Sequence, residues 1–352
     1  MPPQRFARAP APGGVQAPVG DRGAVMRFRV GESHVPTGGF RGARAQGVAA
    51  AAVAVVLAAL ASWSCAPSGA TPRRIRVVAT YSVIADLARQ VAGDRAEVHA
   101  LVPVGTDPHT YEPRPGDARR LAEADLVLYN GLNLELWFDR FVRGSGTRAR
   151  IVVASDGVTP ILIQDPLSRF QGAPDPHAWL DVQNVIRHYV PTIRDALIAA
   201  DPQGAAAYRA QAERYLAELR ALDAWIRQRV AAIPPERRKL VTTENALHYF
   251  AARYGFEVVG WIYTLAPESE PPARRMVELV ERIRRERVPA LFVDLTLNPR
   301  LMERLSQETG VPIRGALYID SLGRPGSGAD TYVGMMRANV ELLVAGLGGG
   351  RP

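Results

Sequence analysis

Short apolar runs alternate with amphipathic stretches in the first half of the chain. The runs predict β-strands at residues 76–80, 98–104, 126–129 and 151–154. Segments 82–92 and 117–124 predict helices, with Ser82 as the cap of the first and Gly93 as its end. This alternation is typical of a mostly parallel sheet covered by helices.

The longest periodic segment covers residues 204–233. Its apolar side chains recur at gaps of three and four from Tyr208 to Val230, which predicts an amphipathic helix that ends at Pro234. At a rise of 1.5 Å per residue it is roughly 45 Å long, enough to span two stacked domains. An ordinary surface helix or a coiled-coil arm is the alternative. Residues 181–199 are also helical, with a kink or break at Pro191.

The alternation restarts after this helix. Strands are predicted at 239–242, 257–261, 290–294 and 313–318, and helices at 245–254, 272–286, 299–309 and 331–347. The pattern predicts an α/β protein with two βα lobes joined by one long helix. The N-terminal lobe is expected at 75–200, the connecting helix at 201–235 and the C-terminal lobe at 236–347.

The first part of the chain has a different composition. Residues 1–46 are rich in Pro, Gly and Arg and are predicted to be a disordered N-terminal extension. An uncharged small and apolar run then ends at Cys65, the only cysteine. We interpret residues 47–65 as a signal segment in which Cys65 resembles the lipidation site of a bacterial lipoprotein, followed by a polar tether at 66–74. The alternative is a plain secretory signal with an incidental thiol.

Charge is concentrated in the same N-terminal part. The net charge is +8, and residues 1–64 contribute +5 of it through seven arginines against Asp21 and Glu32. The remainder therefore carries only +3, which gives no support to nucleic-acid binding. A hydrophobic content of 47% is normal for a folded soluble protein.

Two loops share the tripeptide Asp-Pro-His. His109 lies in the Gly- and Pro-containing stretch 105–113, and His177 lies in 175–179. Proline and glycine exclude the first stretch from a helix or a central strand, so His109 is on a stiff loop after a predicted strand. The repeated frame suggests two walls of one metal site, although a loop histidine is more often structural or solvated.

Carboxylates follow two predicted strands of the second lobe, Glu244 after 239–242 and Asp320 after 313–318. Ligands bind at the carboxyl ends of strands in open α/β sheets. Two imidazoles and two carboxylates suit Mn, Fe or Zn, and the absence of thiolates argues against Cu(I) or an iron–sulfur cluster.

Six motifs together resemble the metal-binding solute receptors of manganese, zinc and iron ABC importers. They are Gly-Thr-Asp-Pro-His-Thr-Tyr-Glu-Pro (105–113), Ala-Asp-Leu-Val-Leu-Tyr-Asn-Gly (124–131), Asp-Pro-His-Ala-Trp-Leu-Asp (175–181), Thr-Glu-Asn-Ala-Leu-His-Tyr-Phe (243–250), Ile-Asp-Ser-Leu (319–322) and Asp-Thr-Tyr-Val-Gly-Met-Met (330–336). The resemblance covers about residues 75–345. It implies two α/β lobes bridged by a rigid helix, with the metal in the cleft between them. Its ligand positions fall on His109, His177, Glu244 and Asp320.

The same resemblance implies a partner and a location. The metal is cargo that the receptor passes to an ABC permease with its ATPase, and a lipid on Cys65 would hold the receptor at the extracytoplasmic face of a membrane. We expect a monomer.

The choice of metal depends on one ligand and one loop. Zinc-specific members of the family usually carry a histidine where Glu244 stands and often a His-rich loop, whereas residues 131–176 contain no histidine. Both differences favour Mn or Fe over Zn, with a zinc-specific receptor as the alternative. His248, four residues after Glu244, would share its face on a helix and is an alternative ligand.

The remaining candidate residues are given supporting roles. Trp179 is expected to pack at the cleft, the histidines His99 and His188 to lie at the surface or in packing, and three carboxylates to cap loops or support ligands: Asp107, Glu112 and Asp181.

Two other classes of function are open. A metal-dependent hydrolase needs an open coordination position and a substrate pocket, and the sequence has no Gly-x-Ser-x-Gly or His-Glu-x-x-His motif. A surface adhesin has no specific feature in its support. We therefore expect a receptor and not an enzyme.

Overall fold

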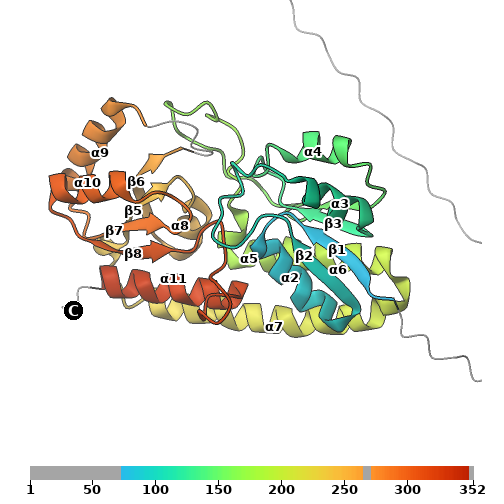
Figure 1. Ribbon diagram of the computed structural model, residues 1–352. Helices are drawn as coiled ribbons and strands as arrows, with labels where there is room; N and C mark the ends of the chain where they lie inside the picture. Colours follow the sequence, from blue (N-terminus) through green and yellow to red (C-terminus); the bar gives the residue numbers. More distant parts are fainter. Residues whose placement is uncertain (1–72, 265–270, 349–352) are drawn as a thin grey trace, which may run out of the picture. The chain divides into compact units, whose positions relative to one another are not determined.

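Two parallel four-stranded sheets form the framework of the computed structural model, which describes residues 73–264 and 271–348 (Figure 1). The predicted extension, the signal segment with Cys65 and nearly all of the tether lie outside the described residues. Among the described residues, no helix is long and apolar enough to cross a membrane.

Both sheets have the same strand order. The first is β2-β1-β3-β4, with bounds β1 Ile75–Ala79, β2 Ala96–Ala100, β3 Leu126–Tyr129 and β4 Arg150–Val153. The second is β6-β5-β7-β8, with bounds β5 Lys239–Glu244, β6 Glu257–Tyr263, β7 Leu291–Asp294 and β8 Ile313–Leu317. All paired strands are parallel, so the carboxyl ends of each sheet meet at one edge. The predicted fold of two α/β lobes is confirmed.

Helices cover the sheets. In the first lobe they are α2 Ser82–Ala92, α3 Pro115–Glu123, α4 Phe138–Ser145, α5 Val182–Asn184 and α6 Val190–Ala200; in the second they are α8 His248–Tyr254, α9 Ala273–Glu286, α10 Arg300–Thr309 and α11 Tyr332–Leu347. Helix α4 was not predicted. A π-helical turn at Val185–Tyr189 separates α5 from α6 just before Pro191, which agrees with the predicted break.

The predicted connecting helix is α7, Ala205–Val230. Its 26 residues correspond to about 39 Å. It packs against α2 and α6 of the first lobe and against α11 of the second (Figure 1). Asp223 on this helix accepts hydrogen bonds from Arg253 and Tyr254 of α8 at 2.8 and 3.0 Å. One continuous helix therefore contacts both lobes, and the described residues belong to one compact unit.

Two local predictions in the first lobe were wrong. Ser82 does not cap α2: its Oγ instead accepts the N–H of Leu322 at 3.0 Å, a tertiary contact that no local pattern contains. Strand β2 begins and ends earlier than expected. The chain keeps bonding to β1 through Leu101 and Val102 and then turns at Pro103, which has no N–H to continue the pairing.

Candidate metal centre

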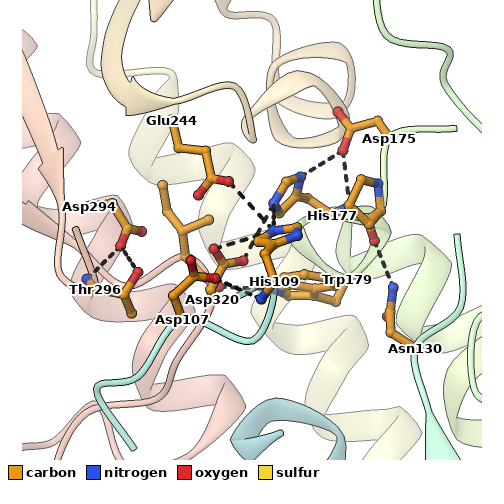
Figure 2. Close-up of polar contacts among 12 residues, drawn as sticks. Asp107, His109, Asn130, Asp175, His177, Trp179, Glu244, Asp294, Thr296 and Asp320 are labelled. Atoms are coloured by element: carbon orange, nitrogen blue, oxygen red, sulfur yellow. Dashed lines mark hydrogen bonds and ion pairs between the residues drawn. The ribbon is translucent and has the colours of Figure 1, made fainter. Parts of the chain in front are cut away.

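Four buried side chains from different parts of the chain meet between the lobes (Figure 2). His109 comes from the loop after β2, His177 from the end of the loop after β4, Glu244 from the last residue of β5, and Asp320 from the turn after β8. One donor atom from each lies within 4.8 Å of all the others. The four residues that the sequence singled out are therefore brought together.

The nitrogen and oxygen donor atoms of these four residues lie close together around a common point. His109 Nε2 lies 3.4 Å from His177 Nε2 and 3.5 Å from Glu244 Oε1, and His177 Nε2 lies 3.4 Å from Asp320 Oδ1. No hydrogen-bond donor reaches either carboxylate oxygen of Glu244 or Asp320, although all four oxygens are buried. Buried carboxylates without donors are costly, and a cation would stabilise them. Imidazole nitrogens with carboxylate oxygens form a donor set that suits Mn, Fe or Zn.

Each histidine loop is shaped by the aspartate of its Asp-Pro-His frame. The N–H of His109 donates to Asp107 Oδ1 at 2.7 Å, and the N–H of His177 donates to Asp175 Oδ1 at 3.0 Å. An aspartate that accepts the N–H two residues later forms a tight turn, and each turn places its imidazole at the donor group. Asp107 therefore has the expected capping role.

Of the other two carboxylates that were expected to cap loops or support ligands, only Asp181 has a capping role. Asp181 caps α5 by accepting the N–H of Gln183 at 2.8 Å, whereas Glu112 is exposed.

Asp175 also holds the imidazole of His177. The distance from Asp175 Oδ1 to His177 Nδ1 is 2.7 Å, which orients Nε2 toward the other donors. Burial opposes a charge on His177, but the carboxylates of Asp175 and Asp320 outweigh it and raise the pKa of His177 to about 10. Burial dominates at His109, whose Nδ1 has no hydrogen-bond partner, and lowers its pKa. The two imidazoles thus differ in charge before a metal binds.

The two carboxylates also differ. Burial and the nearby charge of Asp320 raise the pKa of Glu244 well above its usual range. Burial acts in the same direction on Asp320, but the imidazole of His177, whose Nε2 lies 3.4 Å from Oδ1, outweighs it, and the pKa of Asp320 is lowered. One carboxylate is therefore protonated more readily than the other.

His248 lies outside the donor group. Its Nδ1 is 3.2 Å from Asp175 Oδ2, and its ring packs edge-on against Trp261 at a centroid distance of 5.5 Å. The expectation that His248 and Glu244 share a helix face was wrong, because Glu244 ends strand β5 and helix α8 begins only at His248. His99 and His188 are also outside the group.

Sequence reasoning missed one acidic neighbour of the site. Asp294 ends strand β7 as Glu244 ends β5, and it is buried with no hydrogen-bond donor at Oδ2. Burial and the charge of Asp320 raise its pKa to about 7. Its place at a strand end was the signal that could have identified it.

Trp179 does more than pack at the cleft. Its ring lies 5.3 Å from the ring of His177, and its Nε1–H donates to the carbonyl of Ile319 at 3.2 Å. Since Ile319 directly precedes Asp320, Trp179 links one donor segment of each lobe.

Two α/β lobes with buried imidazole and carboxylate donors between them are typical of two-lobed receptors that bind a metal ion. The chain belongs to the ZnuA family, the periplasmic component A of zinc-uptake complexes, whose model matches residues 77–346.

Individual members of the family are similar over most of their length. The chain is 41% identical over 273 residues to the manganese-binding lipoprotein MntA of Halalkalibacterium halodurans, a match that covers 78% of this chain and 88% of that protein. The periplasmic zinc-binding protein TroA from Treponema pallidum superposes with a TM-score of 0.72 at 32% identity, covering 78% of this chain and 99% of TroA. A Mn-bound periplasmic metal-binding protein from Candidatus Liberibacter asiaticus gives 0.68 at 31% identity, covering 78% and 100%. Relatives named for manganese and for zinc both occur.

Proposed function

We propose that this protein is the extracytoplasmic receptor that captures one divalent transition metal ion and delivers it to an ABC permease with its ATPase. The observation that carries the proposal is the buried group His109, His177, Glu244 and Asp320, whose carboxylate oxygens have no other partner. These four residues are the proposed ligands. The family and the transport-receptor names of its members support the same function.

A receptor fits this site better than a hydrolase does. Hydrolysis on a metal requires an open coordination position and room for a substrate beside it. Here the four donors come from both lobes and are all buried, which suits an enclosed ion better than a bound substrate. We therefore propose a binding protein and not an enzyme.

Mn or Fe is the proposed cargo. Two ionised carboxylates bring a formal charge of −2, which offsets a divalent cation, and oxygen donors at half the positions suit Mn(II) and Fe(II). Zinc binds most N/O sites more tightly than Mn, so it should compete for this one. The name of TroA makes a zinc receptor the second candidate.

Metal uptake in a deletion strain tests the function and the cargo together. We expect deletion to abolish high-affinity accumulation of Mn or Fe, to impair growth when these metals are scarce, and to be complemented by the intact gene. In the wild type, added zinc should inhibit the uptake of Mn or Fe. Loss of zinc accumulation alone would overturn the Mn/Fe assignment, and unchanged uptake of all three metals would overturn the receptor assignment.

A lipid on Cys65 is the proposed anchor. The apolar run before Cys65 and the lipoprotein names of relatives such as MntA support it. We expect Cys65→Ser to move the protein from the membrane fraction to the soluble extracytoplasmic fraction, measured by fractionation and by incorporation of labelled fatty acid. A variant that stays membrane-bound and is cleaved elsewhere would contradict lipid attachment at this residue.

A further inference from the structure

The peptide group that joins each site histidine to the preceding proline is hydrogen-bonded through both its N–H and its carbonyl. The Pro108–His109 peptide donates its N–H to Asp107, and its carbonyl accepts the indole N–H of Trp137 at 2.8 Å. The Pro176–His177 peptide donates its N–H to Asp175, and its carbonyl accepts Nδ2–H of Asn130 at 3.0 Å. The two loops are therefore fixed by the same kind of contact on the same peptide atoms.

Both carbonyl partners belong to one short segment. Residues 130–137, which we call the clasp, begin directly after strand β3 and end where helix α4 begins. The clasp contains three consecutive left-handed residues, Gly131 (φ 80°), Leu132 (φ 52°) and Asn133 (φ 68°). For a non-glycine residue this conformation costs roughly 1–2 kcal/mol. Strain of this kind persists only where the surroundings impose it, and it is concentrated at functional sites.

Buried contacts impose the shape of the clasp. Glu135 accepts the hydroxyl of Thr80 at 2.5 Å and the N–H groups of Asn130 and Gly131 at 2.8 and 3.2 Å. The amide oxygen of Asn130 accepts the hydroxyl of Tyr189 at 2.9 Å. The Asn130 amide is thus held in the orientation in which Nδ2 donates to the carbonyl that directly precedes His177 (Figure 2).

We propose that the clasp sets the separation of the His109 and His177 imidazoles before the metal arrives, with Asn130 and Trp137 as positioning residues for metal binding. The inference rests on the proposed function. Groups that orient metal ligands from outside typically account for about 10- to 100-fold in affinity. A preformed pair of imidazoles also avoids the free-energy cost of ordering two loops when the ion binds.

The test substitutes the indole donor and keeps an aromatic ring. In Trp137→Phe we expect the Kd for Mn(II) to rise about tenfold with a stoichiometry of one, and the visible spectrum of bound Co(II) to change because the coordination geometry changes. Trp225→Phe is the matched control: Trp225 is also partly buried, but it lies on α7 with the guanidinium of Arg337 4.6 Å from its ring centre. The control should keep the wild-type Kd and Co(II) spectrum.

Two further measurements keep the inference testable if Trp137→Phe is poorly folded. Asn130→Asp retains an acceptor for Tyr189 and removes the side-chain donor to Pro176, leaving only the N–H of Ala178 on that carbonyl, so it should also raise the Kd and alter the Co(II) spectrum. In the metal-free wild type, the amides of His109 and His177 should already exchange slowly with deuterium. Fast exchange that becomes slow only with Mn(II), or a Trp137→Phe protein with wild-type Kd and spectrum, would overturn the positioning role. A wild-type protein that binds no Mn(II) or Co(II) would instead overturn the proposed function.

Discussion

Replacing either histidine of the site with alanine is expected to weaken Mn(II) binding at least about a hundredfold. Tight four-ligand metal sites supply roughly 10–16 kcal/mol, so one ligand accounts for about 3 kcal/mol, and each 1.4 kcal/mol is tenfold in Kd. His109 and His177 are both buried, and each supplies one of only four donors. Isothermal titration with Mn(II), by competition with a chelator of known affinity, measures the loss.

Two other histidines provide matched controls for this result. His99→Ala, on strand β2, should leave the Kd unchanged. His248→Ala removes a contact to Asp175 and the packing against Trp261 but none of the four donors, so it should have a small effect. If His248→Ala weakens binding as much as His109→Ala while Glu244→Gln does not, then His248 and not Glu244 is the third ligand.

The affinity for Mn(II) is expected to fall by at least about tenfold for each unit that the pH drops between 8 and 6, with protons released on binding. An imidazole must be neutral to bind a metal, and the pKa of His177 is raised to about 10 in the metal-free protein, so below pH 10 the ion competes with a proton. The raised pKa of Glu244 adds a second proton wherever the pH lies below it. Asp320 and His109, with lowered pKa values, add none near neutrality.

Calorimetry in buffers of different ionisation enthalpy counts the protons released at each pH. Asp175→Asn is the informative variant, because it removes the largest of the influences that raise the pKa of His177. Its pH dependence should be shallower than that of the wild type. A wild-type affinity that is independent of pH, with no proton release at pH 7, would contradict a His177 that is protonated in the metal-free protein and loses its proton on binding.

The sequence by itself determined the architecture of the two lobes. Short apolar runs separated by amphipathic segments are local signals, and they located all eight described strands and the connecting helix α7. Helix α4, which is only eight residues long, was missed. The Asp-Pro-His frames were equally informative, since a proline and a hydrogen bond over two residues shape each loop without help from the rest of the fold.

The tertiary structure decided which side chains meet, because those partners lie far apart in the chain. Ser82 looked like a helix cap but accepts a hydrogen bond from Leu322, 240 residues later. Glu244 and not His248 joins the donor group because strand β5 continues to Glu244, an extent set by its pairing with β6.

Tertiary packing also decided which side chains hydrogen-bond to the two histidine loops. Asn130 and Trp137 carry no local sign of a role at the site, yet each reaches a carbonyl that β3 and α4 bring within hydrogen-bond distance across 46 and 29 residues. Local chemistry selects the turns and the faces of helices and strands. Only the packing of the lobes selects the partners of buried polar groups, since each such group must find a partner wherever the fold places one.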